Sequence, residues 1–252
     1  MKVIIGLHSL PGGVNSLDIG EALFHKGWFN NATNLDYSFQ AVRAILNYIA
    51  TSPNSLAYSI SPLNAASDDL SKFGSPAGLL DNGTDWVNTY LRGVQTLISK
   101  SLAPKTTTFV QDCFKGPAFF APFYPDGANI VIDSHIYYFA AAGAYGNYLA
   151  PSVCGQAQYY KGLNVKFPIF VDEWSLQSAY NNTLARRKLN YQTQAYAWSN
   201  YLQGGSSWNA KHNSSVKVDG EGIQRDYWSL EILIAAGVVN PGGKLDSVYC
   251  SS

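Results

Sequence analysis

The sequence is poor in charged residues and has no long hydrophobic run, and each shortage excludes a class of protein. Charged residues make up 13% of the 252 residues, about half of the roughly 25% that is usual. Since 17 Lys and Arg balance 17 Asp and Glu, the chain has no bulk attraction for nucleic acid or an anionic membrane. No apolar stretch is long enough to span a bilayer. We therefore expect a neutral partner, and neither nucleic acid nor a membrane.

Cysteine is also scarce. The three cysteines are too few for a disulfide scaffold, and no His or Cys cluster has zinc-ligand spacing, so we expect no metal and no cofactor. Cys113 lies in an apolar run typical of a strand, whereas Cys154 and Cys250 lie in loop-like sequence. This contrast favours one disulfide between Cys154 and Cys250, with Cys113 as a buried thiol.

Aromatic residues and glycosylation motifs, by contrast, are plentiful. Aromatic residues reach 14%, which suits either a tyrosine-rich core or contacts with sugar rings. Four N-glycosylation motifs begin at Asn31, Asn82, Asn181 and Asn213. Together with the expected disulfide they indicate a secreted lineage. However, the start from Met1 to Gly13 has the pattern of a core strand and not of a signal peptide, because His8 and a Pro-Gly-Gly turn interrupt its apolar run.

Short β-rich runs alternate with longer helical runs, a pattern that predicts a parallel sheet wrapped by helices in one domain over residues 1–252. The expected strands are Lys2–His8, Leu56–Asn64, Thr107–Cys113, Asn129–His135, Pro168–Glu173 and Gly205–Trp208. The expected helices are Asp36–Ala50, Thr84–Ser99 with Thr84 as N-cap, Ala142–Tyr160, Arg187–Leu202 and Asp226–Ala236.

Each expected strand finishes on a residue of the kind found in binding sites. These residues are His8, Asn64, Asp112 (one before the strand's last residue), His135, Glu173 and Trp208. One polar residue at such a place is ordinarily the start of a loop, but a repeated pattern favours an active site at the carboxyl ends of parallel strands.

Three stretches resemble a known enzyme family. Ile5 to Asp18 contains G-L-H-S-L-P-G-G-V-N-S-L-D, which resembles the L-H-G-x-P-G-S-x-N-G-x-D stretch after the third strand of fungal, basidiomycete-type exo-β-1,3-glucanases of glycoside hydrolase family five. Val131 to Phe139, V-I-D-S-H-I-Y-Y-F, is similar to the family's sixth-strand segment. Phe167 to Leu176, F-P-I-F-V-D-E-W-S-L, is similar to its seventh-strand motif V-G-E-W-S. The resemblance covers essentially the whole chain and implies an α/β fold of the (β/α) TIM-barrel type.

The resemblance also implies roles for individual residues. Glu173 matches the nucleophile of a retaining hydrolase. His8, His135 and Tyr137 would hold sugar hydroxyls, together with Asn64, and Trp208 would be the aromatic platform of the eighth strand. The implied partner is a β-glucan or oligosaccharide, and the implied location is secreted or cell wall.

The sequence departs from the family pattern in two places, which affect the implied activity and the implied barrel. The family's fourth strand ends in N-E-P or N-E-A, whose Glu is the general acid/base, but Pro62 to Asp69 reads P-L-N-A-A-S-D-D and places Ala65 there. The family also has two β/α units before the strand that opens this sequence, so we expect an incomplete barrel of about six units. Its open edge predicts closure of the remaining strands or self-association.

Three functions remain open on these grounds. The first is a glucan-binding protein that hydrolyses weakly or not at all, because alanine can neither protonate a leaving group nor activate water. The second is a working hydrolase that uses another carboxylate, for which Asp68, Asp69 and Asp172 are the nearby candidates. The third is a lectin-like or protein-interaction role.

Overall fold

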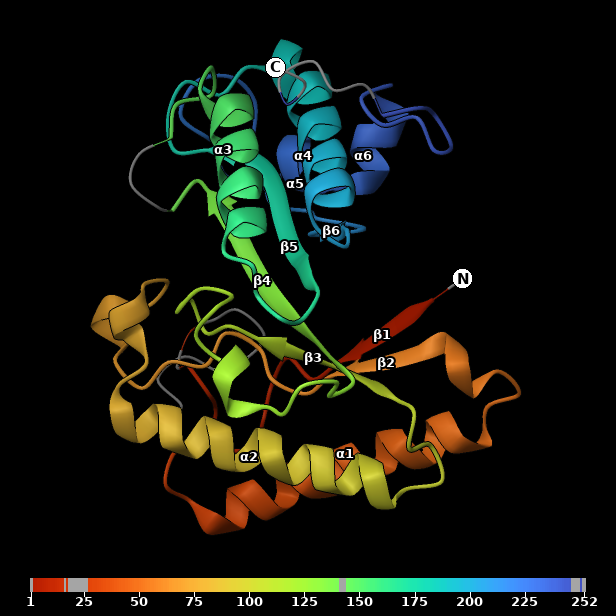
Figure 1. The fold of residues 1–252 in the computed structure, drawn as a ribbon. Coiled ribbons are helices and arrows are strands. Elements are labelled where there is room, and N and C mark those ends of the chain that lie inside the picture. Colours follow the sequence, from red (N-terminus) through yellow and green to blue (C-terminus); the bar gives the residue numbers. More distant parts are fainter. Residues whose placement is uncertain (1, 16, 18–26, 141–143, 246–249, 251–252) are drawn as a thin grey trace. The chain divides into compact units, whose positions relative to one another are not determined.

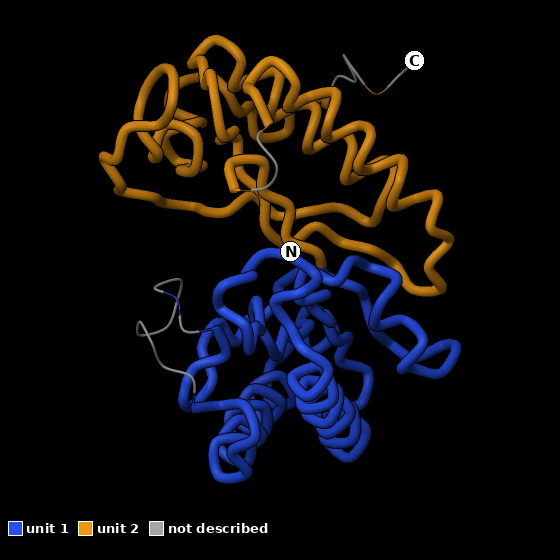
Figure 2. The backbone as a smooth tube through the Cα atoms, turned by 90° about the vertical axis from the view of Figure 1, so that its left-hand side faces the viewer, with its two compact units in different colours: residues 1–133 blue, residues 134–252 orange. Residues whose placement is uncertain are grey.

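The computed structural model describes residues 2–15, 17, 27–140, 144–245 and 250 (Figure 1). The chain divides into two compact units, residues 1–133 and 134–252 (Figure 2). A 6-stranded sheet runs in chain order, with parallel pairing. Its strands are β1 (Val3–Gly6), β2 (Tyr58–Ser61), β3 (Thr107–Gln111), β4 (Ile130–Tyr138), β5 (Ile169–Ser178) and β6 (Gly205–Ser207). Helices lie between most of these strands, so the expected α/β class of the (β/α)-barrel type is confirmed.

The first unit packs two long helices, α1 (Ala32–Thr51) and α2 (Asp81–Lys100), against strands β1 to β3 (Figure 1). The apolar residues recur at helical spacing and are buried, as expected from the sequence: Val42, Leu46 and Ile49 on α1, and Val87, Leu91, Val94 and Ile98 on α2. Trp28 fills the space beside them, with its ring 5.4 Å from that of Tyr90 and its Nε1 donating to Ser38 Oγ at 3.0 Å.

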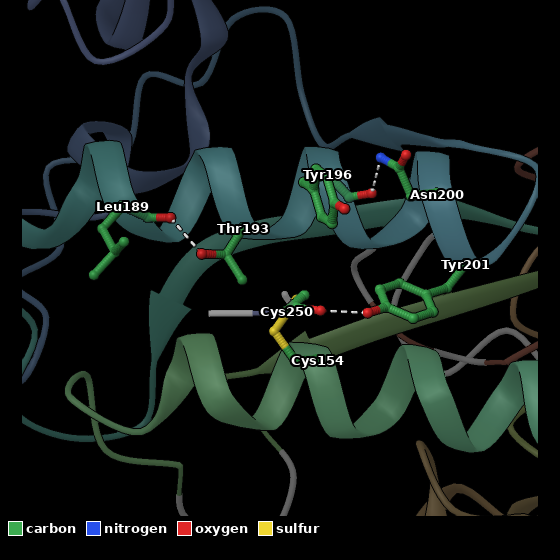
Figure 3. Close-up of a disulfide and its surroundings, with 7 residues drawn as sticks. All are labelled: Cys154, Leu189, Thr193, Tyr196, Asn200, Tyr201 and Cys250. Carbon is green, nitrogen blue, oxygen red and sulfur yellow. Dashed lines mark hydrogen bonds between the residues drawn. A yellow bond between two sulfur atoms is a disulfide. The ribbon is translucent and has the colours of Figure 1, made fainter. Parts of the chain in front are cut away.

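The second unit packs helices α3 (Leu149–Gly162) and α4 (Arg187–Tyr201) side by side, with a disulfide beside them (Figure 3). This disulfide joins Cys154 to Cys250, the two cysteines that the sequence pairs, and Cys113 is a buried free thiol. Cys154 lies in helix α3, however, and not in a loop as expected. The Tyr201 hydroxyl of α4 donates to the Cys250 carbonyl. Two short helices, α5 (Arg225–Trp228) and α6 (Leu230–Ala235), complete the core with Tyr227 and Leu233.

Several helix boundaries differ from those expected. Thr84 is not an N-cap, because α2 begins at Asp81 and the Thr84 amide already donates to the Leu80 carbonyl. Asn31 caps α1 through its side chain, which accepts from the Asn34 amide at 3.1 Å, so α1 begins before Asp36. The expected helix over Asp226–Ala236 is split at Ser229, and α3 begins only at Leu149. Ala142, where that helix was expected to begin, lies outside the described residues, as does Asp18.

Strand boundaries and burial also differ. β1 is not buried on both faces, since Val3, Ile4 and Ile5 are half-buried and Gly6 is exposed. The reason is its place at one end of the strand order, where β2 is its hydrogen-bonded neighbour. Glu173 does not end its strand either, because β5 continues to Ser178 and the following Ala179 amide donates to the Tyr138 carbonyl.

Candidate functional site

Glu173 lies at an irregularity in β5. Val171 pairs with Gly205 and Trp174 pairs with Ser207, so three steps along β5 match two along β6. An extra residue of this kind breaks the strict alternation of side chains and re-aims one of them. Asp172 and Glu173 are accordingly both half-buried, whereas the flanking Val171 and Trp174 are buried. The sequence therefore places Glu173 on a strand, and the register shift between β5 and β6 falls at this residue.

Two side chains of β4 hold this carboxylate. The Tyr137 hydroxyl donates to Glu173 Oε2 at 2.8 Å, and His135 Nδ1 lies 3.3 Å from the same oxygen. His135 and Tyr137 can both reach it because residues two apart in a strand share a face. The side chains are well shielded, with 4% of His135 and 12% of Glu173 exposed. The structure thus brings together three of the residues that the sequence singled out, all within the second unit.

An aromatic cluster that the sequence did not reveal supports Tyr137. The Trp228 ring stacks on the Tyr137 ring, with centroids 5.2 Å apart and planes inclined by 21°. Phe139 packs against both rings, and His212 lies 5.7 Å from Trp228 on centroids. Trp228 Nε1 donates to Gln177 Oε1 at 2.6 Å, which fixes the indole on β5. Trp228 lies in a run with the pattern of an ordinary helix, so the sequence did not indicate that its ring contacts Tyr137.

Trp208 follows β6 directly. Its amide donates to the Trp174 carbonyl at 2.8 Å, so its backbone is tied to β5 next to Glu173. The peptide bond from Trp208 to Asn209 is cis. Trp208 is half-buried.

The remaining sequence candidates belong to the first unit. His8 lies just beyond β1 and is half-buried, while Asn64 and Ala65 follow β2 and are 7% and 2% exposed. Ala65 has a φ of 46°, in the left-handed region that side-chain-bearing residues seldom adopt. The side-chain Nδ2 of the buried Asn15 donates to the Ala65 carbonyl at 3.2 Å, and the Ser67 backbone amide donates to the Val14 carbonyl. The stretch Ile5–Asp18, which carries part of the family resemblance, is therefore in contact with the stretch Pro62–Asp69, which departs from the family pattern.

The acidic residues near Ala65 have structural contacts. Asp68 Oδ1 accepts from the Leu80 amide at 2.7 Å. Asp69 accepts from the Ser71 amide and hydroxyl and pairs with Lys72 at 3.0 Å. The hydrogen bonds from Ser71, followed by those of Lys72, hold the pKa of Asp69 below its ordinary value. Both carboxylates therefore stabilise the loop before α2.

Three of the four predicted glycosylation positions are exposed. Asn82 in the first turn of α2, Asn181 after β5 and Asn213 are exposed, and Asn31 is half-buried as the cap of α1. Among the described residues, no group of three or more His, Cys, Asp or Glu has the arrangement of a metal site. Within the same residues, no helix combines the length and the apolar character needed to cross a membrane.

The arrangement around Glu173 is suited to nucleophilic chemistry. A carboxylate that accepts a hydrogen bond from a phenol keeps a fixed orientation, and an imidazole nitrogen lies 3.3 Å from the same oxygen. The adjoining aromatic faces offer an apolar surface of the kind against which a sugar ring can pack. The second unit can therefore present an oriented carboxylate next to an aromatic wall.

Comparison with solved structures identifies close relatives. The crystal structure of rutinosidase from Aspergillus niger is 39% identical, with a TM-score of 0.90 over 95% of this chain and 67% of that one. A second structure, AoRut, is 37% identical, with a TM-score of 0.90 over 96% of this chain and 67% of the other. A family 5 xyloglucanase from Paenibacillus pabuli shares the fold, with a TM-score of 0.60 at 12% identity over 95% and 76% of the two chains. No protein-family model and no curated protein sequence matches the chain.

Proposed function

Because this chain belongs to the glycoside hydrolases that include the Aspergillus niger rutinosidase, we propose that it binds a β-glucoside at a site centred on Glu173 and hydrolyses it weakly. The observation that carries the proposal is the Glu173 carboxylate itself. It is held by Tyr137 at 2.8 Å and faces His135 at 3.3 Å. In this proposal Glu173 is the nucleophile of a retaining mechanism, and His135, Tyr137 and Trp208 of the same unit contact the sugar.

The weakness of hydrolysis follows from residue 65. Retaining enzymes need a second carboxyl that protonates the leaving oxygen and later activates water. By the motif resemblance this group belongs at position 65, where the chain has alanine. Loss of a general acid/base costs about 10² to 10⁴ in rate. Binding of the glycoside does not need that carboxyl, so affinity for the sugar is retained.

Two glycosides are candidate ligands. Identities of 39% and 37% to rutinosidase structures favour a rutinoside, the class to which the name of that enzyme refers. The motif over Ile5–Asp18 favours a β-1,3-glucan instead. We propose the rutinoside as the first ligand to test, because the identity extends over nearly the whole chain.

The alternative functions have less support. A hydrolase with a substitute acid next to position 65 would need a free carboxylate there, but Asp68 and Asp69 are bound to neighbouring backbone and side chains. A purely lectin-like or protein-interaction role would not require a carboxylate held by a phenol and an imidazole. We further propose a secreted or cell-wall location, in keeping with the four sequons and the disulfide.

The decisive experiment uses glycosides whose aglycone leaves without protonation, such as dinitrophenyl β-rutinoside and dinitrophenyl β-glucoside. The first step then needs only the nucleophile, whereas water attack remains unassisted. We expect a covalent glycosyl adduct on the peptide that contains Glu173, detected by mass spectrometry, and faster turnover when azide is added.

Glu173→Gln is the matched control, since it keeps the size of the side chain and removes the nucleophile. It should form no adduct. An adduct on another residue, or equal labelling of the Glu173→Gln variant, would refute the assignment of Glu173.

A further inference from the structure

Two tyrosines form an exposed aromatic pair in the second unit. Tyr145 follows β4 and Tyr180 follows β5, and each is 47% exposed. Their ring centroids lie 5.2 Å apart, with planes inclined by 39°. Exposed aromatic rings that pack on each other keep one apolar face each for water or a ligand.

The backbone beneath this pair is fixed. Tyr145 and Tyr180 form a parallel bridge, and the Gly146 amide donates to the Tyr180 carbonyl at 2.8 Å. The Ala179 amide donates to the Ala144 carbonyl at 3.0 Å. A side chain at residue 146 would collide with the Asn181 carbonyl, so glycine is required there. The backbone that carries the two rings is therefore fixed by hydrogen bonds.

The residue next to Tyr180 is an exposed asparagine of a glycosylation motif. Asn181 has a φ of 54°, and its backbone amide donates to Asp219 Oδ1 at 2.6 Å. The neighbouring Asn182 is buried and bonds Ser178 through its side chain. Within the described part of the chain, the Asn181 side chain makes no hydrogen bond. The side-chain nitrogen of Asn181 is thus free for modification, while its backbone is anchored by the bond to Asp219.

We propose that Asn181 carries an N-linked glycan whose first sugar packs on the Tyr145 and Tyr180 rings. In this reaction the Asn181 amide nitrogen bonds to the anomeric carbon of a lipid diphosphate-linked oligosaccharide. The bond from that carbon to the diphosphate breaks, the lipid diphosphate leaves, and one amide proton is released. The apolar C–H face of the sugar then covers aromatic surface that is otherwise exposed.

The position of the pair favours this glycan over a sugar bound at Glu173. Tyr180 is seven residues beyond Glu173 (180 − 173), and at about 3.3 Å per residue an extended chain would separate them by on the order of 20 Å. A glycoside of two sugars on Glu173 would not span that distance, whereas Asn181 is adjacent to Tyr180. The same rings could alternatively bind the far end of a longer substrate, and the experiment distinguishes the two.

The test starts from protein secreted by yeast and trimmed with endoglycosidase H to a single sugar per site. We expect peptide mass spectrometry to find that sugar on Asn181. The trimmed protein should melt about 2 to 4 °C above the Thr183→Ala variant, which lacks the motif. This is the shift expected when the contact between sugar and rings stabilises the fold as much as a typical single interaction does. In a Tyr145→Ser/Tyr180→Ser background this difference should vanish. The Asn82→Gln variant is the control, and its effect should be the same in both backgrounds.

A second readout does not depend on variants. Ring currents should shift the proton resonances of the Asn181-linked sugar upfield relative to those of the sugar on Asn82. An unmodified Asn181, a melting difference that survives removal of both tyrosines, or unshifted resonances would overturn the proposal. So would weaker oligosaccharide binding by the Tyr145→Ser/Tyr180→Ser variant of unglycosylated protein, which would assign the rings to the substrate.

Discussion

At the residue scale, the contacts of Glu173 combine features that the sequence reveals with one that it hides. Strand alternation places His135 and Tyr137 on one face, and their motif marks them as candidates. The register shift at Glu173 depends on how β5 pairs with β6, which no local pattern records. Trp228 escaped detection for a similar reason. It comes from a short helix far along the chain and reaches Tyr137 only through tertiary packing.

Trp228 is predicted to be a positioning residue for Glu173. Its stacking on Tyr137 holds the phenol that donates to the carboxylate. We expect Trp228→Ala to slow adduct formation from a dinitrophenyl glycoside about 10- to 100-fold, since a small misplacement of a reacting group has effects of that size. The measurement is the rate of dinitrophenolate release in the first turnover.

Trp228→Phe is the matched control, because it keeps an aromatic ring on Tyr137 and loses only the hydrogen bond to Gln177. It should retain most of the rate. If Trp228→Ala is folded and reacts as fast as the parent protein, then Tyr137 does not depend on the stack.

At the element scale, the sequence predicted the interiors of helices well and their ends less well. The spacing of Val42, Leu46 and Ile49 is sufficient to locate α1, because it reflects one buried face. The ends depend on contacts from other elements. Asp68, for example, binds the Leu80 amide just before α2, and no sequence pattern links these two residues.

The disulfide between α3 and Cys250 should contribute strongly to stability, because it closes a loop with a sequence separation of 96. Loops of that length favour the folded state by restricting the unfolded chain, and loss of such a bond typically costs about 2 to 5 kcal/mol. We expect Cys154→Ala/Cys250→Ala to lower the free energy of unfolding by this amount in urea titrations.

Cys113→Ala is the control within the same chain. It removes a buried thiol without opening a loop, so it should cost about 1 kcal/mol. Burial raises the pKa of the Cys113 thiol above its ordinary value, and the negative charge of Asp112 raises it further. The native protein should therefore not react with thiol reagents at this buried cysteine. Equal stability of the double variant and the parent protein would show that the disulfide does not restrict the unfolded chain.

At the scale of the whole molecule, the parallel strand order was predictable because each apolar run is followed by an amphipathic one. The exposure of β1 was not. Its uninterrupted apolar sequence predicts burial on both faces, but burial also requires neighbours, and β1 is at one end of the strand order. Periodicity describes a strand and does not report what covers it.

The half-buried apolar residues of β1 lead us to predict self-association through this strand. Sedimentation equilibrium should show concentration-dependent dimers of the parent protein, and Ile4→Lys should shift the equilibrium to monomer. Tyr37→Lys adds the same charge at an exposed aromatic position on α1 and should have no effect, since Tyr37 is 52% exposed and lies outside β1. A parent protein that stays monomeric at all concentrations would contradict the prediction.

We propose that Glu173 is the nucleophile of a retaining glycoside hydrolase and that alanine at position 65 removes its general acid/base. The most direct measurement is hydrolysis of an unactivated rutinoside and of β-1,3-glucan by Ala65→Glu, with Ala65→Gln as a control of equal size. We predict that Ala65→Glu hydrolyses one of them at least 10²-fold faster than the parent, from the general acid/base contribution of about 10² to 10⁴, and that Ala65→Gln does not. A folded Ala65→Glu variant no faster than Ala65→Gln on either substrate would contradict the claim.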